Sequence, residues 1–314
     1  MASRPESPLP SDHAPPQSAP PANGQGDLLL LLMPPVFVFL WSTGFVVTKA
    51  GLPYVDPLTF LVLRFIAVIA LMTLVSLAWR APWPQGRAAM LHVAVSGALL
   101  HGGYLGGVFT AIKAGMAAGL VALICGMQPI LTAFVAAPVL RERVTPRQWA
   151  GLVLGLAGVA LVLERKLSLE GLSVVSVAAA GFALVSFTMG TVYQKRFCPK
   201  LDLRSGSVIQ FIGALALVGP FALLLEENRV EWTGTFILSL AWLVLVLSIG
   251  AISLLTLLIR RGAVTRVASF QYLVPPTTAA LAWLMFGETF AGLALAGMVM
   301  TVVAVALVNA PAQK

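Results

Sequence analysis

The stretch WSTGFVVTKAGL, residues 41–52, lies at the end of the first apolar segment, and FTMGTVYQKRFC, residues 187–198, lies 146 residues further on. At this offset Gly44 falls on Gly190 and Lys49 falls on Lys195. The same register continues with Phe65 and Phe211, Ile66 and Ile212, Pro129 and Pro275, Glu142 and Glu288, and Gly151 and Gly297. Chance similarity between apolar segments would drift in register. The second half therefore repeats the first, an organisation typical of secondary transporters, whose substrate path lies between the repeats.

The composition is that of a membrane protein. Hydrophobic residues make up 59% of the chain and charged residues 10%, whereas about 25% of residues are charged in an average soluble domain. This excludes an ordinary globular enzyme. We predict an all-α membrane protein with ten transmembrane helices, at residues 29–49, 57–78, 88–110, 117–138, 147–163, 172–194, 204–225, 235–258, 265–286 and 290–308.

Three regions follow from these spans. Residues 1–28 are predicted to be a disordered, cytoplasmic tail, because Met1 to Gly26 contains seven prolines together with Ser, Gln and Ala and cannot bury a core. Residues 29–163 and 172–308 form the two five-helix repeats. The short loops leave no room for an ATPase domain, and no phosphate-binding GxxxxGK[ST] motif occurs. Cys125 in a span and Cys198 in a basic loop suggest no disulfide.

The distribution of lysine and arginine predicts the orientation, because cationic loops stay on the cytoplasmic side. With the N-terminus inside, five cations lie outside and fourteen lie inside: Arg4, Arg80, Arg87, Arg141, Arg143, Arg147, Lys195, Arg196, Lys200, Arg204, Arg260, Arg261, Arg266 and Lys314. Both termini are therefore predicted to be cytoplasmic. The net charge of +8 is explained by anionic lipid headgroups, without nucleic acid. Because five spans are an odd number, the second repeat must be inverted, as alternating access requires.

The chain also resembles a known family. The stretch 41–52, Leu63-Arg64-Phe65, the Pro129, Glu142 and Gly151 set with its repeat equivalents, and the basic stretch 258–269 are similar to EamA-type carriers of the drug/metabolite transporter superfamily. The resemblance extends from the first span to the last. It implies a ten-helix carrier of the bacterial inner membrane, with a central cavity enclosed by the first four helices of each repeat and with the fifth and tenth helices at the periphery. The superfamily includes exporters of amino acids, other metabolites and drugs.

The peripheral spans carry small residues four apart. These are Gly151 and Gly155 followed by Gly158 in the fifth span, and Gly292 and Ala296 in the tenth. Such spacing lets helices approach closely in lipid. It could form the seam of a homodimer, but packing of each helix onto its own repeat is the favoured interpretation.

Polar and aromatic residues near the middle of the spans are the candidate substrate-binding residues, because an unpaired polar group in hydrocarbon costs several kcal/mol. Trp41 and Tyr104 have amphipathic rings that suit a zwitterionic or aromatic substrate, although they could simply fill space between helices. The full set is Trp41, Ser42, Thr43, Arg64, His101, Tyr104, Gln128, Phe187, Thr188, Gln210, Gln271 and Tyr272.

Arg64 and His101 are the ionisable residues placed well inside the membrane. Arg64 could bind a substrate carboxylate through its bidentate fork, or it could satisfy backbone carbonyls at a broken helix; its repeat equivalent, Gln210, could donate hydrogen bonds at the same depth. His101 could carry a proton, but a hydrogen bond to a neighbouring helix is favoured.

Carboxylates are missing from the middle of every predicted span, which disfavours a proton-coupled exporter of cationic drugs. Glu142 lies among Arg141, Arg143 and Arg147, and we expect it to be a solvated salt-bridge partner. The prolines inside spans, Pro34, Pro35, Pro129, Pro220, Pro275 and Pro276, should kink their helices. Those next to Gln128 and Gln271 could be gates or static bends.

The expected function is export of a small metabolite, an amino acid or a related compound, by alternating access and without a cofactor or metal. The alternatives are a multidrug exporter of the same fold and a membrane subunit or receptor that does not transport. An enzyme is disfavoured because no HExxH or GxSxG motif is present.

The asymmetry of the cations generates a test of the topology. Cysteine labelling or reporter fusions should place both termini and the loop 195–204 in the cytosol. A periplasmic position for that loop would contradict the inverted repeat.

Overall fold

A computed structural model describes residues 24–116, 118–163, 172–286 and 292–310. The chain divides into two units, Met1–Leu32 and Met33–Lys314. In the first unit the described residues 24–32 are helical, and most of the predicted disordered tail lies outside the described residues.

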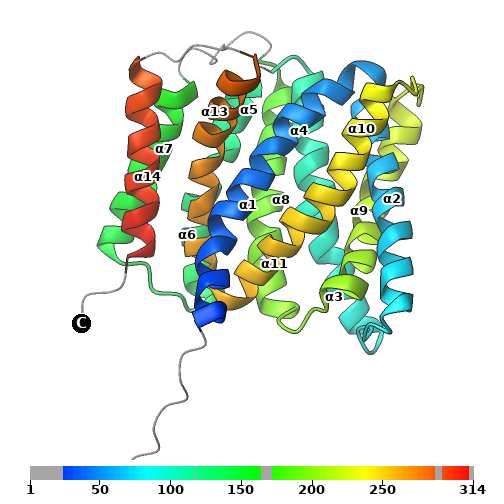
Figure 1. The fold of residues 1–314 in the computed structure, drawn as a ribbon, viewed down its shortest axis with the longest axis horizontal. Helices are drawn as coiled ribbons and strands as arrows, with labels where there is room; N and C mark the ends of the chain where they lie inside the picture. The colour runs from blue at the N-terminus through cyan, green and yellow to red at the C-terminus, as the bar shows by residue number, and fades with distance from the viewer. Residues whose placement is uncertain (1–23, 117, 164–171, 287–291, 311–314) are drawn as a thin grey trace, which may run out of the picture. The chain divides into compact units, whose positions relative to one another are not determined.

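The described part of the chain is helical, apart from one isolated antiparallel bridge between Val55 and Val230. Figure 1 shows the elements, which are α1 (Gly24–Gly51), η1 (Leu52–Tyr54), α2 (Pro57–Ala78), α3 (Arg87–Gly97), η2 (Ala98–Gly103), α4 (Tyr104–Lys113), α5 (Ala118–Cys125), α6 (Gln128–Leu140), α7 (Pro146–Leu163), α8 (Val174–Phe197), α9 (Leu203–Leu225), α10 (Gly234–Trp242), η4 (Leu243–Ala251), α11 (Ile252–Arg261), α12 (Val264–Ser269), η5 (Phe270–Leu273), α13 (Val274–Phe286) and α14 (Gly292–Asn309).

Among the described residues, eight helical stretches are long and apolar enough to cross a membrane, and they coincide with eight of the predicted spans. The predicted first span lies in α1, whose apolar part at 32–44 is shorter. The predicted ninth span, 265–286, is divided among α12, η5 and α13. The chain is therefore an all-helical protein with multiple membrane-spanning segments.

The two halves share the same irregularities. The third helix of each half contains a π-helical segment, η2 in the first and η4 in the second, and the two overlap at the offset of 146 residues. The fourth helix of each half is broken, between α5 and α6 and again at η5. Proline lies in the first turn after each break, as Pro129 and Pro275, where its missing N–H costs no helical hydrogen bond. Pro34, Pro35 and Pro220 lie inside helices that continue without a break.

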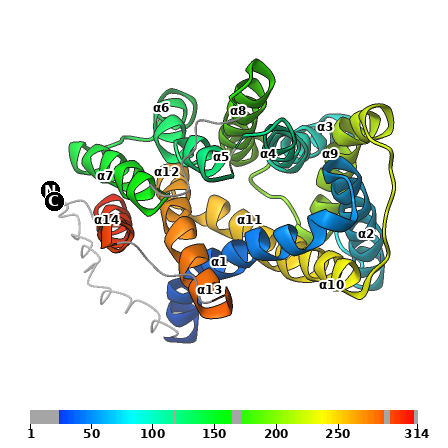
Figure 2. The ribbon, with the colours of Figure 1, turned by 90° about the horizontal axis from the view of Figure 1, so that it is seen from above.

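Helices α7 and α14 pack side by side, as both views show (Figures 1 and 2). A Cβ atom added to Gly297 would lie 2.6 Å from the Gly158 carbonyl oxygen, and one added to Gly158 would lie 2.8 Å from that of Gly297. The expectation that these helices pack onto their own repeats was wrong, because the small residues join the two repeats to each other. Gly292 and Ala296 are exposed and take no part in this closest approach.

The loops form two sets that are joined by separate hydrogen bonds. One set contains the loops around 80–87, 141–147, 195–204 and 260–264 and the residues near 310. The other contains the loops around 51–57, 113–116 and 226–234. No hydrogen bond between described residues joins a loop of one set to a loop of the other. The two sets are those that the cation distribution assigned to opposite sides of the membrane.

The close approach of α7 and α14 makes Gly297 sensitive to substitution. Gly297→Ala should lower the free energy of unfolding by about 1–3 kcal/mol, because the added methyl group overlaps the backbone of α7. Thermal or denaturant unfolding in detergent measures this loss. Gly181→Ala in α8 is the control, since no heavy atom lies within 4 Å of the added Cβ. Equal stability of Gly297→Ala and the wild type would contradict the packing described.

Candidate functional site

A pocket of about 230 Å³ lies where α6, α8, α11 and α12 meet. Its lining residues come from both halves of the chain: Gln128, Phe187, Thr191, Leu255, Ile259, Val264, Val267, Ala268 and Gln271. This volume includes space that is open to solvent, and the enclosed part has room for about one water molecule. Its wall is apolar except for the two glutamines and Thr191, and no charged side chain lines it.

Gln128 supplies the polar group of the pocket that lacks a partner. It is the first residue of α6, directly before Pro129, so the break between α5 and α6 positions it. Its Nε2 donates to Thr132 Oγ1 at 2.9 Å, whereas its Oε1 is buried without a partner among the described residues. Leaving a buried acceptor unpaired costs about 1–3 kcal/mol. This oxygen is therefore poised to accept a hydrogen bond from a bound molecule or water.

Three aromatic rings adjoin the pocket through Phe187. The Phe187 ring stacks on Tyr104 with centroids 4.4 Å apart and on Trp41 with centroids 6.1 Å apart. These rings come from α1, α4 and α8. The structure thus brings together three of the predicted aromatic site residues, and offset stacking fixes their orientation.

The turn between α11 and α12 closes one side of the pocket, since Ile259 and Val264 on either side of this turn both line it. Lys195 Nζ donates to the carbonyl oxygens of Ile259, Arg260 and Gly262 at 2.7, 2.9 and 3.0 Å. It thereby satisfies the carbonyls that the end of α11 leaves free. The ammonium group therefore holds the α11 side of the turn.

Glu142 holds the other side of the same turn. Its carboxylate accepts hydrogen bonds from Val264 N at 2.8 Å, Thr265 N at 3.3 Å and Thr265 Oγ1 at 3.1 Å. The expectation of a solvated salt-bridge partner among arginines was wrong, because Glu142 caps the first turn of α12 instead. We refer to Glu142 and Lys195, with the turn 260–264 that they bind, as the corner latch. Sequence reasoning missed its role, although the repeat register had singled out both residues.

Arg64 lies away from the pocket. Its side chain is 5% exposed, and its Nε donates to Ser248 Oγ at 2.9 Å, in the π-helical segment η4. Ser248 Oγ in turn donates to Leu243 O at 2.9 Å. Arg64 therefore joins α2 to η4 and does not cap carbonyls at the breaks before α6 and α13.

His101 lies in η2 and is 3% exposed. Its ring stacks on Phe211 with centroids 4.7 Å apart and planes 6° apart. Its ring makes no hydrogen bond to another described residue, and its Nε2 is buried without a partner. The expected hydrogen bond to a neighbouring helix is therefore not made within the described part of the chain.

The remaining predicted site residues make contacts between or within helices. Gln210 Nε2 donates to Ser96 Oγ at 3.0 Å and to Gln194 Oε1 at 2.8 Å, so it joins α3, α8 and α9. Tyr272 is fully buried, and its hydroxyl donates to Leu152 O on α7 at 2.9 Å. A Cβ at Gly155 would overlap the Tyr272 ring. Both residues lie away from the pocket.

The predicted hydroxyl residues bond mainly to their own helices. Ser42 Oγ donates to Val38 O at 2.7 Å, and Thr188 Oγ1 donates to Leu184 O at 2.8 Å. Thr43 Oγ1 donates to Leu40 O at 2.7 Å and accepts from Trp242 Nε1 at 3.1 Å. None of the three lines the pocket.

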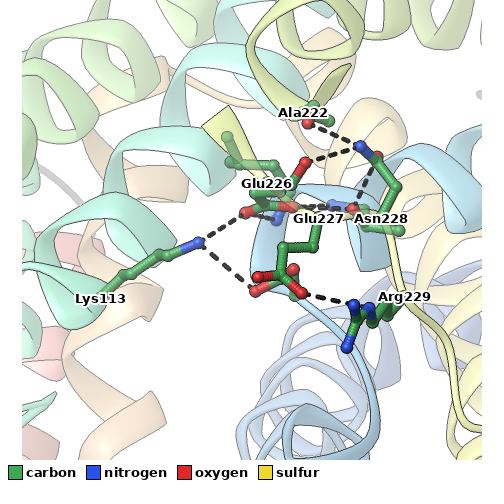
Figure 3. Close-up of polar contacts among 9 residues, drawn as sticks. Lys113, Ala222, Glu226, Glu227, Asn228 and Arg229 are labelled. Atoms are coloured by element: carbon green, nitrogen blue, oxygen red, sulfur yellow. Dashed lines mark hydrogen bonds and ion pairs between the residues drawn. The ribbon is translucent and has the colours of Figure 1, made fainter. Parts of the chain in front are cut away.

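A second charged cap is formed by Glu226 in the other set of loops, and Figure 3 shows it together with Lys113. The buried Glu226 carboxylate accepts hydrogen bonds from Leu58 N at 2.8 Å, Thr59 N at 2.7 Å and Thr59 Oγ1 at 2.8 Å. Lys113 Nζ lies 3.6 Å from Glu226 and 3.4 Å from Asp56. Like Glu142, Glu226 reaches from one half of the chain to a helix start in the other. Sequence analysis did not single it out.

Known proteins resemble the chain over most of its length. A probable amino-acid metabolite efflux pump of Salmonella typhimurium is 29% identical over 272 residues, which cover 84% of this chain and 89% of that protein. An uncharacterized transporter of Bacillus subtilis, YvbV, is 28% identical over 288 residues, covering 87% and 88%. A solved crystal structure shares the fold with a TM-score of 0.74 at 22% identity, covering 89% of this chain and 96% of that one.

The model of the EamA-like transporter family matches the chain twice, over residues 26–164 and 174–310. These matches fall on the two halves whose irregularities coincide at the offset of 146 residues. The resemblance carried by the stretch 41–52 and the paired Pro, Glu and Gly residues is thereby confirmed. The protein is a multi-pass membrane protein that belongs to the EamA-like transporter family.

Proposed function

We propose that this protein exports an amino acid or a related small metabolite across a bacterial inner membrane by alternating access. The observation that carries the proposal is the pocket, because residues of both repeats line it and the broken helices α6 and α12 supply part of its wall. The Salmonella relative, a probable amino-acid metabolite efflux pump, supports the substrate class. An amide group with a free oxygen and an apolar wall suit a small substrate with a donor group and a hydrocarbon part.

The topology of the proposal is ten crossings in two inverted five-helix repeats, with both termini in the cytoplasm. The separation of the loops into two hydrogen-bonded sets supports it, since each loop set lies where alternate crossings would bring it. The fourteen-to-five distribution of cations supports the orientation. In that orientation the corner latch lies on the cytoplasmic side and the Glu226 cap lies on the periplasmic side.

The corner latch has the position of a cytoplasmic gate. Lys195 bonds the carbonyl of Ile259, Glu142 bonds the N–H of Val264, and both of the residues they bond line the pocket. Releasing these charge-assisted hydrogen bonds would free the short turn to move away from the pocket. We therefore propose that this turn opens the pocket to the cytoplasm when substrate enters.

A non-transporting receptor or subunit is the competing function. The pocket with an unpaired amide oxygen argues against it, because a packed membrane subunit gains nothing from a buried acceptor without a partner. A multidrug exporter driven through a buried carboxylate is disfavoured because the predicted spans have no mid-membrane Asp or Glu.

Export itself is tested in cells that overexpress the protein and are challenged with toxic amino acids, their analogues and drugs. Wild type should confer resistance to amino acid analogues, and Gln128→Leu should reduce that resistance by removing the hydrogen-bonding group of the pocket. Uptake of the same analogues into inside-out vesicles should fall roughly tenfold or more, corresponding to the loss of one buried polar contact.

The matched control is Val139→Leu, an exposed residue on the same helix, which should leave resistance unchanged. Equal transport by Gln128→Leu and the wild type would remove the pocket from the transport path. Resistance to drugs alone would favour the multidrug alternative.

The gate is tested by chemical access. In a chain with Cys125→Ser and Cys198→Ser, Val267→Cys places a single thiol in the pocket wall. Adding Glu142→Ala removes the acceptors for the first turn of α12. It should speed labelling by a membrane-impermeant maleimide from the cytoplasmic side by roughly tenfold, the loss expected for charged hydrogen bonds.

Arg143→Ala is the control for this measurement, because Arg143 is exposed and makes no hydrogen bond to another described residue. It should leave the labelling rate unchanged. A rate that is the same with and without Glu142 would show that the turn does not control access.

A further inference from the structure

The buried guanidinium group of Arg64 has a charge without a partner. Its Nε binds Ser248, but neither of its two terminal amino groups makes a hydrogen bond or ion pair with another described residue. The predicted spans carry no mid-membrane Asp or Glu that could compensate this charge. A guanidinium remains charged in proteins and presents its donors as a fork that matches a carboxylate. The two terminal amino groups of Arg64 are therefore free to bind an anion.

His101 provides a second group without a partner. Its ring stacks on Phe211 with centroids 4.7 Å apart, and Phe65, the residue next to Arg64 in α2, contacts the same Phe211 ring with centroids 5.5 Å apart. Its Nε2 is buried and has no partner in the described part of the chain. A neutral histidine with its proton on Nε2 can donate to an anion without adding a charge. Arg64 and His101 thus lie on two elements, α2 and η2, that both contact Phe211.

Ser248, which binds Arg64, lies in η4, and η4 continues directly into α11, which lines the pocket. Ser248, Ile252, Leu255 and Ile259 are all buried and follow one another at spacings of three or four residues, so they lie on one face of η4 and α11. Leu255 and Ile259 line the pocket, and Ser248 binds Arg64. At about 1.5 Å per residue, Ser248 and Leu255 are about 10 Å apart along the helix. Trp41 packs against both of the apolar clusters that contain Phe187 and Phe211.

We propose that Arg64 and His101 form a carboxylate-binding subsite, one step along the substrate path from the Gln128 pocket. The inference rests on the proposed export function and narrows its substrate class to molecules that bear a carboxylate. The fork of Arg64 takes the two carboxylate oxygens, and His101 Nε2 donates to one of them. The apolar part of the substrate lies toward Trp41 and the pocket.

Binding measurements on the full-length purified protein distinguish recognition of the carboxylate from recognition of the ammonium group of an amino acid. The probes are 3-phenylpropionate, which has a carboxylate alone, and phenylalanine amide, which has an ammonium group alone. Titration calorimetry should show that Arg64→Gln weakens binding of 3-phenylpropionate roughly ten- to a hundredfold, the loss of charged hydrogen bonds. Binding of the amide should change less than about twofold, because the amide presents no carboxylate to Arg64.

Variants at Ser248, His101 and Arg64 distinguish loss of the subsite from a folding defect. Ser248→Ala removes the internal partner of Arg64 and leaves its charge, so it should keep the preference for 3-phenylpropionate. His101→Gln keeps a donor and should retain most of that binding, whereas His101→Leu should lose it. If Arg64→Gln does not fold, Arg64→Lys keeps the charge without the fork and should weaken 3-phenylpropionate selectively.

Several results would overturn the subsite. These are equal losses for the acid and the amide in the Arg64 variants, unchanged binding of the acid, or no binding of the acid by wild type. Phenylalanine counterflow in proteoliposomes distinguishes a failure of the export proposal. Arg64-dependent binding of the acid without counterflow would support the subsite and refute export, whereas counterflow with unchanged acid binding in Arg64→Gln would do the reverse.

Discussion

The need to satisfy every backbone polar group inside hydrocarbon is the constraint on which the rest of this structure depends. A helix satisfies its own groups except at its ends, where four N–H and four C=O groups remain free, and each such group costs several kcal/mol without water. This protein has breaks in the fourth helix of each half. The chain must supply partners at helix ends, and charged side chains do so at three of them: the start of α12, the end of α11 and the start of α2.

Glu142, Lys195 and Glu226 show how this requirement is met. Each places a full charge on the helix end of opposite partial charge, which strengthens the hydrogen bonds. Each also comes from a part of the chain that is distant in sequence from the helix it caps, so the bond holds two elements together. Because the hydrogen bonds of one cap are strong and lie close together, they would all break together when the two elements move apart. For this reason the corner latch combines stability with a proposed role in gating.

Side-chain groups that lack a partner are equally informative. Gln128 Oε1 and His101 Nε2 are buried without partners in the described part of the chain, and the charge of Arg64 has no acidic partner there. A protein tolerates such groups where a ligand or water completes them. Gln128 lines the pocket together with Leu255 and Ile259, and Arg64 binds Ser248 on the same face of η4 and α11. His101 stacks on Phe211 instead.

The amino-acid sequence by itself determined the membrane class, the duplication and the positions of most spans, and it predicted kinks at Pro129 and Pro275, where the structure has breaks. Hydropathy, repeat register and proline geometry are local properties. The sequence also indicated that Gln128, Phe187 and Gln271 belong among the candidate site residues. Only the tertiary structure decided that α7 pairs with α14, that Tyr272 binds Leu152, and that Glu142 caps α12 rather than meeting nearby arginines. Those outcomes depend on which helix ends and faces meet across the two repeats, and the spacing of residues within one segment carries no information about that.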